Sequence, residues 1–356
     1  MTSTAVDGIR HLAHITTIEE VKECNNPADK IHAVRPAGTL WWVVAPKTMT
    51  EGDKGVYFEI DSILNTKHPV FAPIRGKKAT RVINGHHIEG VVLHTMYLRE
   101  TLSQGLILPV SEFEGLNEDA TQEEVDTYFD GIITKHVEEK ILAGGDYGLE
   151  AFPNFITKTD AERVQNIPTD FLDSITADDV YATEKIDGTS MTVWRDIDTG
   201  EIRIANRDRS IKADAMDSKN WKQYIDGYRR YAHVFDQLKP GEWVQGELFC
   251  DRIGGNFKFT TGDQPDFRAF HASNDNVEAL FKDANLWVPV LDIEWVGNGF
   301  AALEQADTVE SQVAPGQTAE GIVWYFKDGK PRRELANRAH FKIVSNVFLT
   351  RGKRRK

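Results

Sequence analysis

The chain has 356 residues, of which 40% are hydrophobic, and a formal net charge of -13 at pH 7. This length favours two domains, and no apolar run is long enough to span a membrane. The N-terminus shows no charged and then apolar signal segment, and the two cysteines, Cys24 and Cys250, lie far apart. We therefore expect a soluble, cytoplasmic monomer without a disulfide framework or a structural zinc site.

The negative charge is unevenly distributed along the chain. Ser111–Asp130 contains eight acidic residues and no basic one, whereas Gly321–Lys356 contains 11 basic and 2 acidic residues. An acidic protein repels nucleic acid overall, but this segregation leaves a nucleic-acid partner open. The basic end Arg351–Lys356 is by default a disordered solubilising tail, with a phosphate-contacting arm as the alternative.

The N-terminal third reads as a small all-β module. Short apolar runs alternate with turn residues between positions 31 and 109, at Leu40–Ala45, Val56–Ile60, Val91–Leu93 and Leu106–Leu108. An OB-type barrel is the leading choice, because it is small and commonly binds nucleic acid. Four aromatic residues could form its binding face, although strand alternation places at least half of them in the core: Trp41, Trp42, Tyr57 and Phe58.

A helix is predicted between this module and the rest of the chain. Apolar residues recur at helical spacing over Thr121–Leu142, and the pattern breaks at Gly144-Gly145. We place residues 1–115 in the OB-type module, 116–148 in a helical linker and 149–356 in a second domain.

The second domain mixes strands and helices without a βαβ rhythm, which predicts an α+β class with largely antiparallel sheets. The predicted helices are Asp160–Asn166, Ser218–Leu238 and Val277–Phe281. The predicted strands are Glu184–Arg195, Glu201–Asn206, Trp243–Phe249, Arg268–His271, Trp287–Trp295, Ile322–Phe326 and Ala339–Val344. No P-loop or dinucleotide-binding glycine motif is present.

The most informative stretch is Lys185-Ile186-Asp187-Gly188. A lysine at a strand edge can act as a covalent nucleophile when burial, a nearby cation or a metal lowers its pKa. Lys-x-Asp-Gly is the signature of nucleotidyltransferases that take AMP or GMP onto lysine. Asp-Gly alone is an ordinary turn and recurs elsewhere in this chain, but only Lys185 stands two residues before one.

Carboxylates follow this motif in positions that suit a metal. Glu247 lies inside an apolar strand and Glu320 at the start of another. Each alone is more often a turn or ion-pair residue. Together with Asp187, they could converge on a hydrated Mg²⁺ or Mn²⁺, which prefers oxygen ligands.

Cations and one aromatic residue complete the pattern. Arg207 ends the predicted strand that returns from Lys185, where it could bind a phosphate, although a surface arginine is equally common there. His340 and Lys342 share one face of a strand and fit a pair that handles pyrophosphate. Phe270 could stack on a purine, with core packing as the plainer alternative.

In this order, the motifs resemble motifs I, Ia, III, IIIa, IV and V of the covalent nucleotidyltransferases, which include capping enzymes and DNA ligases. Those enzymes carry an OB domain after the last motif, whereas too few residues follow Lys342 here and the β module lies in front. This arrangement, with Ser103–Leu106 and Ala161–Asn166, is similar to the fifth RNA ligase family. The resemblance implies an N-terminal OB module and a C-terminal ATP-grasp-like nucleotidyltransferase domain.

The resemblance implies an ATP-dependent RNA ligase that joins 3'-OH and 5'-phosphate ends, at a nicked duplex, through lysyl-AMP on Lys185. It also implies a metal, Mg²⁺ or Mn²⁺, whose waters are held by Asp187, Glu247 and Glu320. Lys342 would contact the α-phosphate, Arg207 the phosphate of the RNA end, and Phe270 the adenine. The implied ATP-binding residues are Glu184, Lys185, Ile186, Arg163, Arg207, Glu247, Phe270, Glu320, His340 and Lys342.

One position departs from the family pattern, since His340 stands where the family has lysine. A histidine is only partly charged near neutral pH, which predicts a sharper fall of adenylylation between pH 6 and 8 than in His340→Lys. Two alternatives stay open. One is a DNA ligase or capping-type nucleotidyltransferase with rearranged domains, and the other is an inactive RNA-binding relic.

Overall fold

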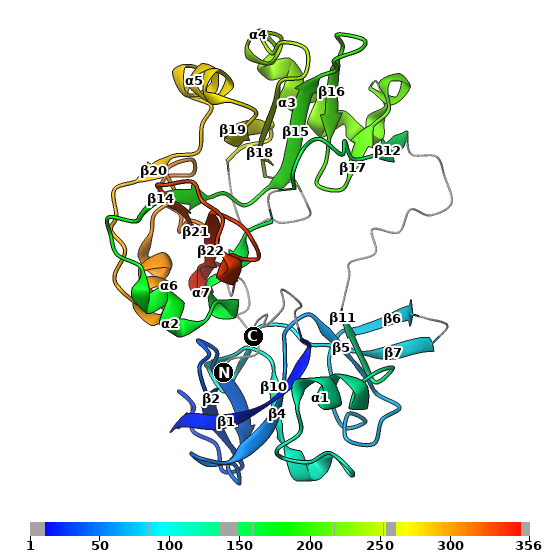
Figure 1. Ribbon diagram of the computed structural model, residues 1–356, viewed down its shortest axis with the longest axis vertical. Coiled ribbons are helices and arrows are strands. Elements are labelled where there is room, and N and C mark those ends of the chain that lie inside the picture. The colour runs from blue at the N-terminus through cyan, green and yellow to red at the C-terminus, as the bar shows by residue number, and fades with distance from the viewer. Residues whose placement is uncertain are drawn as a thin grey trace.

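The computed structural model of the protein describes residues 11–83, 86–135, 148–158, 160–216, 218–251, 253 and 261–349, without the side chains of 81–83, 86 and 87. A barrel forms one end of the molecule, and two further sheets lie beyond it (Figure 1). The sheet that contains β14 (Val180–Lys185), β21 (Gly321–Phe326) and β22 (His340–Val344) lies between the barrel and the sheet that contains β15 (Thr189–Arg195) and β19 (Asp266–Ala272) (Figure 1). No helix in the described ranges is long and apolar enough to cross a membrane.

The N-terminal part consists of two antiparallel sheets, in the orders β10-β4-β1-β2-β3 and β11-β5-β7-β6. The edge strands of the five-stranded sheet are β10 and β3. Just before them, the backbone N–H of Gln104 donates to the carbonyl of Trp42 over 2.8 Å, so the sheet curls into a nearly closed barrel. The predicted all-β module is confirmed. Its strands are β1 (Ala13–Lys22), β2 (Ile31–Pro36), β3 (Val43–Pro46), β4 (Lys54–Phe58), β5 (Ser62–Asn65), β6 (Lys78–Ile83), β7 (His86–Val92), β10 (Leu106–Pro109) and β11 (Ile133–Lys135), with β8 (Met96–Leu98) and β9 (Thr101–Ser103) as a separate hairpin.

The four aromatic residues proposed for the barrel's binding face are mostly core. Trp41, Tyr57 and Phe58 are at most 1% exposed. Trp42 alone is half-buried, and the Nζ of Lys22 lies 3.5 Å from the centroid of its ring. The expectation that at least half of them lie in the core is confirmed, but Tyr57 and Phe58 are both buried because each face of β4 is covered by a separate hydrophobic cluster.

The predicted helix over Thr121–Leu142 is confirmed for its first two turns and is wrong over residues 129–135. Helix α1 covers Gln122–Tyr128 and begins with a capping box between Thr121 and Glu124. It ends because Gly131 adopts a φ of 69°, after which β11 pairs with β5. Segment 116–135 thus packs on the barrel instead of forming a spacer, and residues 136–147 lie outside the described ranges. The predicted domain limits stay a prediction.

The second part contains two sheets, in the orders β12-β17-β16-β15-β18-β19 and β13-β22-β21-β14-β20. Among the described strands, β13 and β22 pair in parallel and the other named pairs are antiparallel. The strands are β12 (Leu149–Ala151), β13 (Glu162–Arg163), β14 (Val180–Lys185), β15 (Thr189–Arg195), β16 (Ile202–Ala205), β17 (Arg209–Ile211), β18 (Trp243–Phe249), β19 (Asp266–Ala272), β20 (Val290–Leu291), β21 (Gly321–Phe326) and β22 (His340–Val344). The helices are α2 (Thr169–Ser174), α3 (Lys222–Arg230), α4 (Ala232–Phe235), α5 (Asp275–Asp283), α6 (Gly299–Thr308) and α7 (Asn346–Leu349).

Several predicted elements need correction here. The helix over Asp160–Asn166 is instead β13 followed by a 3-10 turn, because this segment pairs with β22. The helix over Ser218–Leu238 is divided into a 3-10 turn, α3 and α4. The strand over Trp287–Trp295 shrinks to β20, since Pro289 offers no N–H to a sheet. Helix α6 was not predicted.

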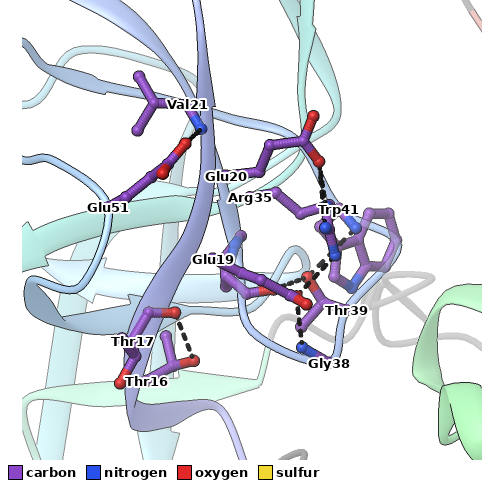
Figure 2. A network of polar contacts seen from close by, with 11 residues as sticks. Thr16, Thr17, Glu19, Glu20, Val21, Arg35, Gly38, Thr39, Trp41 and Glu51 are labelled. Carbon is purple, nitrogen blue, oxygen red and sulfur yellow. Dashed lines mark hydrogen bonds and ion pairs between the residues drawn. The ribbon is translucent and has the colours of Figure 1, made fainter.

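The two parts of the molecule share a contact. Leu40 of the barrel is 3% exposed and belongs to the same hydrophobic cluster as Leu172 of α2. Beside it, the guanidinium of Arg35 is held by Glu19 at 2.7 Å and Glu20 at 3.1 Å (Figure 2). This guanidinium lies 5.2 Å from the ring centroid of Phe300 on α6. Glu19 and Glu20 therefore hold Arg35 against Phe300 of the second part, and Leu40 packs into the hydrophobic core of that part.

Candidate active site

The three strands β14, β21 and β22 present alternate side chains to two different faces. One face packs on the core around Trp324 and Phe341, which is covered by α2 and α6. Lys185, Lys342 and His340 belong to the opposite set of positions and are only partly buried. The predicted nucleophile and the predicted last-motif pair therefore share a face of one sheet.

Lys185 ends β14 next to Glu320. Its Nζ donates to Glu320 Oε2 over 2.5 Å, and the two side chains are 22% and 16% exposed. Burial alone would lower the pKa of Lys185, but the charges of Glu320, Glu247 and Asp187 outweigh it and raise the pKa. Among these carboxylates the lysine is therefore protonated at neutral pH, whereas an active nucleophile needs the lowered pKa that the sequence analysis expects.

Two glycines let the strands approach one another at Lys185. Gly321 pairs directly with Lys185, and a Cβ at this position would overlap the backbone carbonyl oxygen of Ile343. A Cβ at Gly188 would overlap the carbonyl oxygen of Leu248 on β18. These close approaches bring Glu320 and Glu247 toward the lysine. They explain why glycine follows Asp187 and why glycine follows Glu320.

The three predicted metal carboxylates gather around this lysine. Glu247, on β18, has a pKa raised to about 8 by burial, which the charges of Glu320 and Asp187 reinforce and that of Lys185 partly offsets. Asp187 is 8% exposed, in the turn between β14 and β15. Within the described ranges, no three His, Cys, Asp or Glu side chains lie close enough to hold a metal directly.

The predicted phosphate-binding cations lie on the neighbouring strands. Arg163 on β13 pairs with Lys342 on β22. Burial, together with Lys185 and Arg163, lowers the pKa of Lys342 to about 8. Arg207, in the turn between β16 and β17, is 62% exposed and forms an ion pair with Asp160 at 2.6 Å. A second pair, Lys158 with Asp208 at 3.2 Å, lies in the same part of the chain and is also exposed.

Phe270 and Ile186 pack in one hydrophobic cluster. The cluster also contains Ala314, from a segment fixed by Glu184, since the Glu184 carboxylate accepts hydrogen bonds from Ser311 Oγ and from the backbone N–H of Gln312. Glu184 is only 1% exposed. Its carboxylate thus ties the segment that contains Ser311 and Gln312 to the end of β14, beside the predicted nucleophile Lys185. Sequence reasoning did not identify Ser311 as its partner.

The chain was compared with known proteins. A family profile described as an OB-fold domain matches residues 12–110, and one described as RNA ligase matches residues 178–344. Residues 178–344 form an RNA ligase domain. No curated protein sequence matches the chain. Among solved structures, an apo variant of Naegleria gruberi RNA ligase is 29% identical with a TM-score of 0.68, covering 97% of this chain and 98% of its own.

Two further structures of Naegleria gruberi RNA ligase variants match this chain. One holds ATP and Mn and the other AMP and Mn; both are 28% identical, with a TM-score of 0.69. They cover 97% of this chain and 100% and 99% of their own chains, respectively. The match includes the OB-fold domain in front of the RNA ligase domain, which confirms the predicted fold class and domain order.

The last motif of this RNA ligase domain differs from its sequence-based interpretation. The ring of His340 stacks on Tyr325, with centroids 5.1 Å apart. Burial lowers the pKa of His340 to about 4, and the neighbouring His271, Arg338 and Lys342 add to the effect. The predicted titration of His340 between pH 6 and 8 is therefore wrong, because the ring is already neutral throughout that range.

Proposed function

We propose that the protein is an ATP-dependent RNA ligase that joins a 3'-OH to a 5'-phosphate through lysyl-AMP on Lys185. The observation that carries this proposal is the hydrogen bond from Lys185 to Glu320, among three carboxylates and on the same sheet face as Lys342. A lysine that served only as an ion pair would need one carboxylate and no second cation beside it. The ATP and AMP bound in the Naegleria gruberi structures support the same chemistry.

The first step is the attack of Lys185 Nζ on the α-phosphorus of ATP. A bond forms between nitrogen and phosphorus, and the bond from this phosphorus to the bridging oxygen of the β-phosphate breaks, so that pyrophosphate leaves with the electron pair. Glu320 Oε2, at 2.5 Å, is in position to accept the lysine proton. Lys342 and Arg163, side by side, suit the phosphates of ATP, and Phe270 suits the adenine.

A divalent cation fits the chemistry of this site. Burial raises the pKa of Glu247 to about 8 and the charges of Glu320 and Asp187 add to this, so a nearby Mg²⁺ or Mn²⁺ would favour the ionised carboxylate. Asp187, Glu247 and Glu320 would hold it through water. When bound, the cation neutralises phosphate charge and favours the neutral form of Lys185. Mn in the Naegleria gruberi structures supports this assignment.

In the later steps a 5'-phosphate oxygen of RNA attacks the phosphorus of lysyl-AMP and releases the lysine. A 3'-OH then attacks the activated 5'-phosphorus, AMP leaves, and the hydroxyl proton passes to solvent. Arg207, exposed and held by a single carboxylate, is suited to the phosphate of the RNA end. We further propose a nicked duplex as substrate, gripped in part by the OB-fold domain, and action as a cytoplasmic monomer.

Sealing assays test the proposal and separate it from its alternatives. Nicked duplexes with a labelled 5'-phosphate are offered with ATP or GTP, and with a ribose or deoxyribose at the 3'-OH. We expect sealing that requires ATP, the 5'-phosphate and the ribose. Equal sealing of all-DNA nicks would identify a DNA ligase, GMP transfer to a 5'-diphosphate a capping enzyme, and binding without any covalent step a relic.

A further inference from the structure

Three aromatic residues form a ladder across the sheet that carries Lys185. Tyr181 on β14 pairs with Tyr325 on β21, which pairs with His340 on β22. The Tyr181 and Tyr325 rings are 5.4 Å apart with planes at 17°, and the Tyr325 and His340 rings are 5.1 Å apart at 29°. The ladder Tyr181–Tyr325–His340 is therefore a column of stacked rings that crosses three adjacent strands.

The ladder lies on the active-site face, at a defined distance from the reacting lysine. Tyr181 precedes Lys185 by four residues, about 13 Å along a strand at about 3.3 Å per residue. His340 precedes Lys342 by two residues and so points to the same face. Phe270, the ring assigned to adenine, packs instead with Ile186, on the other side of Lys185 along the chain. Along the chain, Lys185 therefore lies between Tyr181 of the ladder and Ile186, which packs with Phe270.

The ladder is uncharged and open at one end. Burial raises the pKa of both tyrosines and lowers that of His340, so all three rings are neutral at pH 7. Strand β20 pairs with Ala182 and Thr183 and ends before it reaches Tyr181. Tyr181 is accordingly 39% exposed, and a further flat ring can continue the column. Neutral stacked rings next to phosphate-binding cations match the alternation of base and phosphate in a nucleic acid.

We propose that the ladder Tyr181–Tyr325–His340 stacks on a nucleobase of the RNA, at a nucleotide near the end being joined. The inference rests on the proposed RNA ligase function and adds a base contact to it. Aromatic side chains stack on bases independently of their sequence, because every base presents a flat ring face. It also gives a reason for histidine at position 340, since a ring continues the stack whereas a lysine would not.

The experiment compares Tyr181→Ala with Tyr181→Phe, which keeps the ring, and with Ile197→Ala, an exposed apolar control at 73% exposure. Lysyl-AMP formation from ATP and the Kd for a nicked RNA duplex are measured separately. We expect Tyr181→Ala to weaken RNA binding about five- to hundredfold and to leave lysyl-AMP formation within about twofold. Tyr181→Phe and Ile197→Ala should match wild type in both assays.

Abasic nucleotides placed singly on either side of the nick identify the base. At one position, the Kd of wild type for the abasic RNA should equal the Kd of Tyr181→Ala for the intact RNA. Tyr181→Ala should bind that abasic RNA no more weakly than it binds the intact RNA. Unchanged RNA binding, or additive effects at every position, would overturn the inference. Equal losses of lysyl-AMP would assign the ladder to the base of ATP. Absence of lysyl-AMP in wild type would refute the proposed function. The Kd values of the two proteins for intact and abasic RNA would still show whether the ladder binds a base.

Discussion

Lys342 illustrates how a catalytic arrangement costs stability. Burial and the nearby charges of Lys185 and Arg163 lower its pKa from 10.5 to about 8. At about 1.36 kcal/mol per pH unit, this difference destabilises the folded protein by about 3 kcal/mol at pH 7. The unfolded chain holds the proton more tightly, so the penalty is complete below pH 8 and disappears as the pH rises to 10.5. Replacing Lys342 by the uncharged methionine should therefore stabilise the fold.

The assay is urea denaturation of wild type, Lys342→Met and the control Lys239→Met, a change at an exposed position. We expect Lys342→Met to raise the free energy of unfolding by up to about 3 kcal/mol at pH 7 and by about half of that at pH 9.5. The control should change by less than about 0.5 kcal/mol at both values. Lys342→Met should also lose lysyl-AMP formation. A variant no more stable than wild type at pH 7, or a gain that does not shrink with pH, would refute the reasoning.

Three further changes follow from the packing. Leu40→Ala should cost about 3 kcal/mol of unfolding free energy, because the side chain fills the core of the second domain; a midpoint equal to wild type in urea would contradict the shared core. Gly321→Ala should abolish lysyl-AMP formation, since its Cβ overlaps Ile343, and labelling at the wild-type rate would show that the strands can separate. His340→Gln should keep the shape of the pH profile of labelling between pH 6 and 8, and a shifted profile would mean that His340 titrates there.

The chemistry-bearing residues were predictable because they lie in short local motifs. Lys185, Glu247 and Glu320 each stand next to residues that fix a strand or turn, and two strand pairings, β14 with β21 and β15 with β18, bring them together. The sequence could not show that Glu320 pairs with Lys185 and raises its pKa, since this depends on how closely β14 and β21 approach. The charge state of His340 was mistaken for the same reason, because its burial comes from other strands.

The errors in secondary structure have tertiary causes. Apolar spacing suggested a long helix after Thr121, but Phe129 is buried against the barrel and Gly131 turns the chain into β11. Arg163 lies in a segment of helical composition that pairs with β22 instead. Local propensity is weak where a segment of a few residues completes a sheet. Leu40 reads as an ordinary strand residue, and only the structure reveals its place in the core of the second domain.

The central claim is that Lys185 carries AMP, and covalent labelling tests it most directly. Purified protein is incubated with α-labelled ATP and Mg²⁺ or Mn²⁺ and separated on a denaturing gel beside Lys185→Ala and the control Lys239→Ala. The account predicts label on wild type and on the control, none on Lys185→Ala, and release of the label by pyrophosphate. Equal labelling of Lys185→Ala, or no labelling of wild type with either metal, would contradict it.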